Sequence, residues 1–501
     1  MKTSKILKKW QFQLPQFVAA SFLLFLPNIN RSFASDDFRV LKRIAIDKII
    51  WIKGFFRPVS DFTLHLNYLL GGFNPAGYYL FNILIHGINS FLLFRFCLSL
   101  KFSENDSRQT LFAFIASLLF LTYPFHTEGI VWILGRGASM ATTFGLSALL
   151  IVMSDWPEKR KILLTSICYF LGLATYESII LLPIIILVLL YRQGMTRRKL
   201  VIWTVSMIAT LVIHLLIRVE IAGSIAGSYG ESFLHIRPLH YIGNFFKVTG
   251  RLFLPPVYQS RSFVLLFIPL ILLLSLLFFL FIRGNKKNPL LVTYFSKLII
   301  ALSIASIVPI LFSVSTKTSE SDRFLYFPSC FLCCSISFLI INLFVTRLGL
   351  FLSIVPLTLY NVFFLEKSNL NWMKASSITK DILASIQSQD SSKNIFFINL
   401  PGDLEGAFIF RLGLKDALLI NKVDPSRLTI VNNLNSEQIR GLPGEIRTEV
   451  KSNEIDIPPV VTIKKDRQEN NTSVTNDHIC LYPSNESIIL YWDKQKVVRL
   501  E

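Results

Sequence analysis

Two adjacent carboxylates, Asp36 and Asp37, follow directly on the first long apolar segment of the chain, in the stretch SFASDDFRV. A carboxylate at the outer end of a membrane helix meets water and can accept a proton from a substrate hydroxyl as a general base. The alternative is a solvated pair that only marks the membrane boundary. Taken alone, the two residues leave both interpretations open.

His126, Glu128 and Arg136 form a second group of polar side chains, in the stretch YPFHTEGIVWILGRGAS. A His and a Glu two residues apart can both reach a divalent cation such as Mg²⁺ or Mn²⁺, or a phosphate-bearing ligand. Two ligands do not define a metal site. The alternative is a helix-capping or hydrogen-bonding role.

Two further ionisable residues border apolar sequence. Glu177 lies in LATYESIILLP, where a carboxylate is costly unless it is paired or reaches water, so it is a functional candidate. Arg323 opens another apolar segment, in ESDRFLYFPS. Its long side chain either reaches the membrane surface without a specific role or binds phosphate.

The segment 77-99 carries a polar stripe made of Asn82, His86 and Asn89. Their spacing of four and three residues places them on one face of a helix. Polar groups at membrane depth face protein or water rather than lipid. Hydrogen bonding between helices is the favoured interpretation, and a functional site is the alternative.

The amino-acid composition of the chain indicates which kind of structural element carries these residues. The chain has 501 residues, of which 52% are hydrophobic and 17% charged, and its mean hydropathy is +0.52. The net charge of +19 comes largely from short basic clusters between apolar segments. That pattern is typical of cytoplasmic loops of a membrane protein and speaks against a nucleic-acid partner.

We therefore predict an all-α polytopic membrane bundle of about eleven transmembrane helices, embedded in a lipid bilayer. The expected spans are 14-30, 77-99, 110-124, 137-154, 162-174, 178-191, 200-218, 263-283, 291-313, 324-345 and 348-365. This topology places the N-terminus in the cytoplasm and the C-terminus outside, in the periplasm of a bacterial inner membrane. The endoplasmic reticulum is the eukaryotic alternative, and a cleaved signal peptide is the alternative for the first span.

The predicted domains are a membrane domain, 1-365, with external loops 31-76 and 219-262, and an extracytoplasmic soluble domain, 366-501. In the soluble domain, short apolar runs alternate with turn residues. This pattern is typical of strands, so we expect a small α/β or β-rich fold there.

Several blocks of the sequence resemble, in order, the polytopic glycosyltransferases of the GT-C superfamily, nearest the protein O-mannosyltransferases with transmembrane and tetratricopeptide-repeat regions. The blocks are SDDF, FRPVSDFTLHLNYLLGGFNPAGYYLFNILIHGINSFLLF, LTYPFHTEGIVWILGRGASMATTFGL, LATYESIILLP and SDRFLYFPS. The resemblance covers roughly 15-190 and 315-345. The chain departs from it at Tyr176, where relatives usually have Lys, and in lacking the repeats.

The resemblance implies transfer of a sugar, most simply a mannose-like hexose, from a polyprenyl-phosphate carrier to an acceptor on the outer face, with inversion. It implies that Asp36 is the catalytic base and that the adjacent Asp37 is the alternative candidate for this role. It also implies that His126 and Glu128 hold a metal or orient Asp36. Contacts to carrier phosphate or substrate are then expected from Arg57, Arg136, Glu177 and Arg323.

The acceptor could be a protein, a lipid or a glycan. Two alternatives stay open from the sequence: a transporter or lipid-carrier flippase, and a non-catalytic membrane scaffold that presents the external domain.

Overall fold

The computed structural model describes most of the chain. The described residues are 13–50, 54–191, 196–225, 238–286, 288–442, 449–451, 454–457, 461–466, 471–476, 478–483 and 487–500. Parts of both predicted external loops, 51–53 and 226–237, therefore lie outside the described residues.

The chain divides into two compact units. The first unit comprises Met1–Ile29 and Ile49–Asn369, and the second comprises Asn30–Lys48 and Leu370–Glu501. The segment with Asp36 and Asp37 thus belongs to the same unit as the C-terminal part of the chain, although more than 300 residues separate them in sequence.

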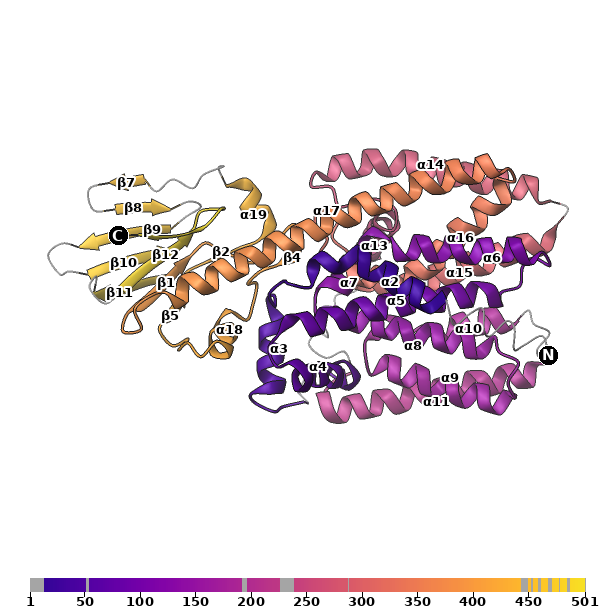
Figure 1. Cartoon of the computed structure of the whole chain (residues 1–501), viewed down its shortest axis with the longest axis horizontal. Coiled ribbons are helices and arrows are strands. Elements are labelled where there is room, and N and C mark those ends of the chain that lie inside the picture. The colour runs from indigo at the N-terminus through magenta and orange to yellow at the C-terminus, as the bar shows by residue number, and fades with distance from the viewer. Residues whose placement is uncertain are drawn as a thin grey trace. The chain divides into compact units, whose positions relative to one another are not determined.

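The first unit is helical. Its elements are α2 (Gln13–Phe25), η1 (Leu26–Asn28), α4 (Pro58–Gly71), α5 (Pro75–Ser99), α6 (Asp106–Leu121), η2 (Pro124–His126), α7 (Thr127–Val131), α8 (Arg136–Val152), α9 (Glu158–Leu173), η3 (Glu177–Ile179), α10 (Leu182–Tyr191), α11 (Arg197–Ala222), α13 (Pro238–Arg251), α14 (Ser260–Gly284), α15 (Pro289–Phe312), η5 (Asp322–Leu325), α16 (Tyr326–Leu343) and the first part of α17 (Arg347–Gln387). Within this unit α8, α9 and α11 lie alongside one another (Figure 1).

Among the described residues, six helices are long and apolar enough to cross a membrane, or seven if the bent pair Asp106–Leu121 and Pro124–Val131 is one span. The predicted count of eleven is not confirmed. Two other predicted spans correspond to shorter helices: α8 has 17 residues and α9 has 16. A helix rises about 1.5 Å per residue, so these two are shorter than the roughly 20 residues that a perpendicular crossing needs. The helices α2 and α10 each border residues outside the described part of the chain.

The second unit combines strands and helices. Its four-stranded sheet has the order β13-β12-β1-β5, in which β1 (Asn394–Ile398) pairs in parallel with β12 (Ser487–Trp492) and β5 (Leu428–Ile430), and β13 (Val497–Leu500) is antiparallel to β12. Four of the five β1 residues are buried, as expected for a central strand covered on both faces.

Smaller elements complete this unit. The helices are α3 (Asp36–Ala45), α18 (Leu414–Ile420), α19 (Ser436–Gly441) and the end of α17, and the paired short strands are β2 (Leu400–Pro401) with β6 (Asn433–Leu434) and β3 (Asp403–Leu404) with β4 (Ala407–Phe408). An antiparallel sheet has the order β11-β10-β9-β8-β7, formed by β7 (Glu449–Lys451), β8 (Glu454–Ile457), β9 (Val461–Asp466), β10 (Asn471–Asn476) and β11 (His478–Pro483).

The start of α3 is bound to the C-terminal part of its unit. The Ser35 amide donates to the Ile409 carbonyl at 2.8 Å, and the Leu412 amide donates to Ser35 Oγ at 3.2 Å. The backbone at Gly413 has φ +84°, and a Cβ there would lie 2.4 Å from the Ser35 carbonyl oxygen. Only glycine permits both this conformation and this close approach. The C-terminal part therefore holds the segment that carries Asp36.

Candidate functional site

A break between α6 and α8 places Glu128 in the interior of the first unit. Pro124 begins η2, and Phe125 has non-helical backbone angles of φ −97° and ψ 21°. The segment Pro124–Val131 is consequently bent by 52° from α6. Proline cannot continue the hydrogen-bond ladder of a helix, so the direction of the chain changes there. Glu128 lies in the short α7 that follows, where it is 1% exposed.

The polar stripe of α5 holds this broken segment in place. Asn82 Nδ2 donates to the carbonyls of Ile130 at 3.0 Å and Trp132 at 3.2 Å, at the end of α7. His86 has Tyr326 Oη at 2.7 Å from Nδ1 and the Leu121 carbonyl at 3.1 Å from Nε2. These bonds join α5 to α6, α7 and α16. The stripe thus has the interhelical role that its spacing favours.

Asn89, the third residue of the stripe, extends the same network. Its Nδ2 donates to the Ser139 carbonyl at 2.8 Å and to Tyr326 Oη at 3.2 Å, and its Oδ1 accepts from Thr143 Oγ1 at 2.7 Å. The amide therefore ties α5 to both α8 and α16.

Glu128 is held by Arg323, which lies in η5. The backbone amide of Arg323 donates to Glu128 Oε2 at 2.9 Å, and its Nη1 donates to Oε1. The Glu128 side chain is 0% exposed and the Arg323 side chain is 16% exposed. A buried carboxylate is tolerated only when it is paired and hydrogen-bonded. This pair therefore fixes the orientation of the Arg323 guanidinium.

Tyr176 lies between two arginines. Arg323 Nε donates to its hydroxyl at 3.2 Å, and the guanidinium carbon of Arg57 lies 4.5 Å from the centroid of its ring. A cation over the face of a tyrosine ring is attracted by the ring quadrupole. The tyrosine thus connects the guanidinium groups of Arg57 and Arg323 without adding a charge.

Glu177 completes the cluster. Its Oε2 accepts from Arg57 at 3.1 Å and its Oε1 from Arg218 at 2.7 Å. With Arg323 and Glu128, the cluster therefore contains three arginines and two glutamates. The side chains of Arg57 and Arg323 are 24% and 16% exposed, whereas that of Arg218 is 5% exposed. Arg57 and Arg323 thus have the most exposed guanidinium groups of the cluster.

A narrow pocket lies against this cluster. It is lined by Arg57, Tyr176 and Glu177 together with apolar side chains that include Phe312 and Phe324, and its volume is about 10 Å³. That volume is about the smallest that holds one water. An anion would therefore have to meet the exposed parts of Arg57 and Arg323 rather than enter this pocket.

Asp36 and Asp37 lie in the first turn of α3, in the second unit. Asp37 is fully buried, and its Oδ2 accepts from the Ala34 amide at 3.0 Å, which stabilises the start of the helix. Asp36 is only half-buried. The two neighbours therefore differ in environment, although the sequence makes them look equivalent. Their convergence with the residues of the first unit stays a prediction.

His126 and Glu128 contact different partners. His126 Nε2 lies 2.7 Å from Ser329 Oγ, and its ring centroid lies 4.2 Å from that of Tyr326 and 4.5 Å from that of Phe120. Both oxygens of Glu128 accept from Arg323. These donors do not fit a shared cation site, and in the described part of the chain no three His, Cys, Asp or Glu side chains form a group that could hold a metal. A metal here stays a prediction, and no step proposed below uses one.

Arg136 is fully buried and links three helices. Its Nη1 donates to Asn67 Oδ1 at 2.7 Å and to Thr63 Oγ1 at 3.4 Å, both on α4. Its Nη2 donates to the Tyr78 carbonyl of α5 at 3.2 Å, and its Nε to the Ile133 carbonyl at 3.2 Å. These contacts give Arg136 a structural role at the start of α8, and the phosphate contact expected for it stays a prediction.

Two charged groups near the cluster were not predicted from the sequence as site residues. Arg218 pairs with Glu177, and Arg251, which is 0% exposed, donates from Nη2 to both carboxylate oxygens of Asp322 at 2.5 and 2.7 Å. Asp322 precedes Arg323 directly, so its ion pair also anchors η5. The sequence does indicate that Arg218 is paired, because an arginine inside the apolar run LLIRVEIA requires a partner.

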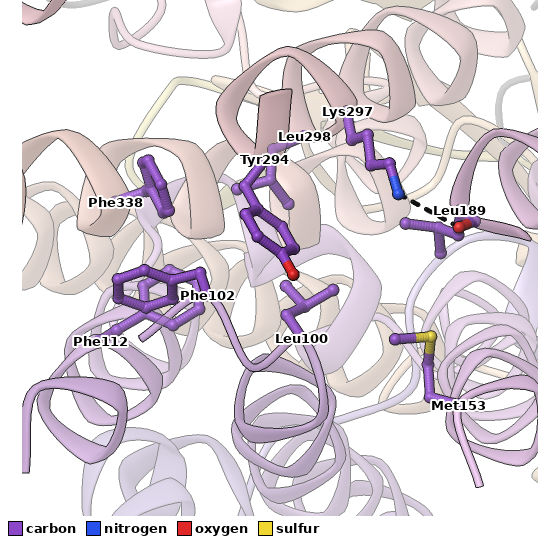
Figure 2. Close-up of a pocket in the computed structure, with 9 residues that line it drawn as sticks. All are labelled: Leu100, Phe102, Phe112, Met153, Leu189, Tyr294, Lys297, Leu298 and Phe338. Carbon is purple, nitrogen blue, oxygen red and sulfur yellow. Dashed lines mark hydrogen bonds between the residues drawn. The ribbon is translucent and has the colours of Figure 1, made fainter. Parts of the chain in front are cut away.

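Another pocket of the first unit differs in character (Figure 2). Its volume is about 90 Å³, and Lys297 is the only charged side chain among the residues that line it. The Lys297 ammonium points to the Leu189 carbonyl, to which it donates at 3.2 Å, while Tyr294, Phe102 and Phe338 belong to the largely apolar lining (Figure 2). Ligand pockets usually measure about 300–1,000 Å³. This pocket is too small for a sugar.

Comparison with known proteins gives no matching family model. The chain is 36% identical to Protein O-mannosyl-transferase TMTC3 of Homo sapiens over 95 residues, which are 19% of this chain and 10% of that protein. It is 30% identical to Protein O-mannosyl-transferase tmtc2 of Xenopus laevis over 172 residues, 30% of this chain and 20% of that protein. The matches therefore span only a tenth to a fifth of these relatives. Over that part, the resemblance to protein O-mannosyl-transferases is confirmed.

Among solved structures, the chain is similar to ArnT from Cupriavidus metallidurans bound to undecaprenyl phosphate, with 13% sequence identity and a TM-score of 0.44. The similarity covers 84% of this chain and 89% of that chain.

Proposed function

We propose that this chain is a membrane glycosyltransferase of the GT-C type. It transfers a mannose-like hexose from a polyprenyl-phosphate carrier to an acceptor hydroxyl, with inversion, at the extracytoplasmic face of a bacterial inner membrane. The observation that carries the proposal is the sequence similarity to protein O-mannosyl-transferases. The geometry of the arginine cluster supports it, because the leaving group of such a reaction is a phosphate anion.

In this proposal Arg57 and Arg323 contact the carrier phosphate. A guanidinium presents several donors in a plane and binds phosphate oxygens in pairs. Glu128 and Tyr176 hold Arg323, while Glu177 and the ring of Tyr176 hold Arg57. Donors that are already oriented need no reorganisation as charge develops on the leaving group, and this lowers the barrier. Since the departing phosphate is a stable anion, the reaction needs no general acid.

Asp36 is the proposed base. It removes the proton of the acceptor hydroxyl while the oxygen attacks the anomeric carbon and the bond from that carbon to the carrier phosphate breaks. Asp36 lies in the first turn of α3 and is half-buried. Asp37 accepts from the Ala34 amide and therefore acts as a positioning residue.

In this proposal the second unit positions the catalytic base. Its residues Ile409, Leu412 and Gly413 bind the backbone at Ser35, directly before Asp36. A base contributes fully only when its position is held within a fraction of an ångström. The C-terminal part is thus proposed to position the base.

The test is direct. Purified full-length protein in lipid nanodiscs is incubated with a panel of polyprenyl-phosphate sugars, and release of polyprenyl phosphate is measured with and without candidate protein, lipid and glycan acceptors. We expect release from at least one hexose donor, and loss of that release in the Asp36→Asn variant. If no donor of the panel is consumed, while an unrelated polyprenyl-phosphate glycosyltransferase consumes its own donor under the same conditions, the proposal is wrong.

A further inference from the structure

The second unit contains a cavity that the proposed reaction does not use. Its volume is about 570 Å³, which lies within the range of small-molecule sites. All of its lining residues belong to the second unit, and they come from the end of α17, the β3–β4 turn, α19 and the hairpin between β12 and β13. Elements from four separate parts of the chain therefore line it.

One wall is a polar face of α17. Asn371, Lys374, Ser377 and Asp381 follow one another at intervals of three or four residues and all line the cavity. This spacing places them on one side of the helix. The face offers an amide, an ammonium, a hydroxyl and a carboxylate in sequence, so both donors and acceptors of hydrogen bonds are available along it.

Another part of the lining contains an ion pair. Arg440 Nε donates to Glu405 Oε1 at 2.6 Å, and the Glu405 amide donates to Ser436 Oγ at 2.8 Å. Trp492, which is 2% exposed, also lines the cavity together with the exposed Gln495. The ion pair and the bond to Ser436 fix the polar groups of this part of the lining before any ligand arrives.

We propose that this cavity binds a saccharide. Most of the residues that line this cavity are polar or charged, while apolar atoms, which include those of Trp492, make up the larger part of its surface. A sugar presents hydroxyls together with apolar C–H groups, and this lining offers a surface for both. Each hydroxyl of a sugar both donates and accepts, and this requires the mixture of groups that the lining provides. The lining carries three cations, Lys374, Arg440 and Lys494, and two carboxylates, Asp381 and Glu405, and the Arg440–Glu405 ion pair neutralises one charge of each sign.

The binding itself does not depend on the proposed reaction. If the chain is a glycosyltransferase, the saccharide is a glycan acceptor or the glycosylated product, and this identification alone rests on the proposed function. The second unit would then both position Asp36 and retain the glycan chain that is being modified.

The experiment measures binding, not turnover. Full-length protein in nanodiscs is titrated with methyl hexopyranosides, the corresponding disaccharides and inorganic phosphate, with calorimetry and saturation-transfer NMR as readouts. Lys374→Ala and Asp381→Asn alter the polar face of α17. Lys415→Ala and Asp416→Asn make the same changes on α18, whose residues do not belong to the lining. Thermal melting of each variant verifies that it is folded.

We expect at least one disaccharide to bind, and Lys374→Ala and Asp381→Asn each to weaken it about tenfold, as expected for one charge-assisted hydrogen bond. The two α18 variants should stay within about twofold of the wild type. Absence of any sugar binding, an equal loss in the α18 variants, or binding of phosphate in place of sugar would each overturn the inference. Asp36→Asn should bind sugar normally. Sugar binding without donor turnover would refute the proposed function and leave this inference intact.

Discussion

Arg323 Nε donates to the Tyr176 hydroxyl over 3.2 Å, so a residue of η5 and the residue that directly precedes η3 meet across the first unit. The resemblance to the protein O-mannosyltransferases implies Lys at the position of Tyr176, which would bring another cation next to Arg57 and Arg323. Tyrosine contributes a ring and a hydroxyl there without a charge.

Tyr176→Phe should raise the KM for the carrier about 2- to 10-fold, because it removes the hydroxyl that orients Arg323 and keeps the ring under Arg57. Tyr176→Leu removes both contacts and should raise KM further. Steady-state kinetics with the polyprenyl-phosphate donor measures both variants. A wild-type KM in Tyr176→Phe would show that the hydroxyl does not orient Arg323, and equal effects of the two substitutions would show that the ring adds nothing under Arg57.

Asp36→Asn should lower kcat at least about 100-fold, the lower end of the contribution of a positioned general base, because an amide cannot accept the proton of the acceptor hydroxyl. Carrier binding and membrane insertion should be preserved. Asp37→Asn should reduce kcat less, since an amide oxygen can still accept from the Ala34 amide. Near wild-type transfer by both variants would refute the assignment of the base.

Arg323→Ala should raise the KM for the carrier with a smaller change in kcat, because a guanidinium that already binds the phosphate in the ground state contributes similarly in the transition state. Arg261→Ala, which removes an exposed arginine at the start of α14, is the matched control and should change neither constant. A loss of kcat without a change in KM would mean that Arg323 acts only in the transition state.

The same Arg323→Ala variant should also be less stable. It leaves the buried Glu128 carboxylate without its cation, which costs about 3–5 kcal/mol. The double variant Glu128→Gln with Arg323→Met removes both charges and should recover much of the lost thermal stability in detergent. A double variant less stable than the single one would indicate that Glu128 has another cationic partner.

Gly413→Ala should disturb the position of Asp36. An alanine Cβ would meet the Ser35 carbonyl oxygen at 2.4 Å, and the φ of +84° is itself strained for alanine by about 1–3 kcal/mol. We expect faster hydrogen exchange in residues 30–48 and a lower kcat. Gly441→Ala, at a position with no atom within 4 Å of the added Cβ, is the control in the same unit. Unchanged exchange in Gly413→Ala would show that this contact does not hold α3.

An alkaline phosphatase fusion after Leu365 should be active, and a fusion within 196–199 should be inactive. The basic clusters alternate along the chain as the positive-inside rule requires, which places the end of the membrane domain outside the cytoplasm. Inactivity of the first fusion would reverse the proposed orientation and place the second unit in the cytoplasm.

Local sequence patterns were sufficient for several elements. Apolar runs predicted the long helices, because burial in lipid depends only on composition over about 20 residues. Helices are present at the expected segments 162-174 and 178-191, as α9 and α10, and η3 with Glu177 lies between them in the chain. The spacing of Asn82, His86 and Asn89 predicted a shared helix face, since periodicity is a property of a single element.

The partners of the charged residues were decided by tertiary structure. Nothing local distinguishes Glu128 as a ligand for a metal with His126 from Glu128 as the counter-ion of Arg323, which is 195 residues away. The same holds for Asp36 and Asp37, which differ in burial. The residue before them, Ser35, is held by contacts with Ile409 and Gly413. A sequence by itself determines which groups must be paired, because burial makes isolated charges costly. Which group pairs with which follows only from the packing of segments that are distant in the chain.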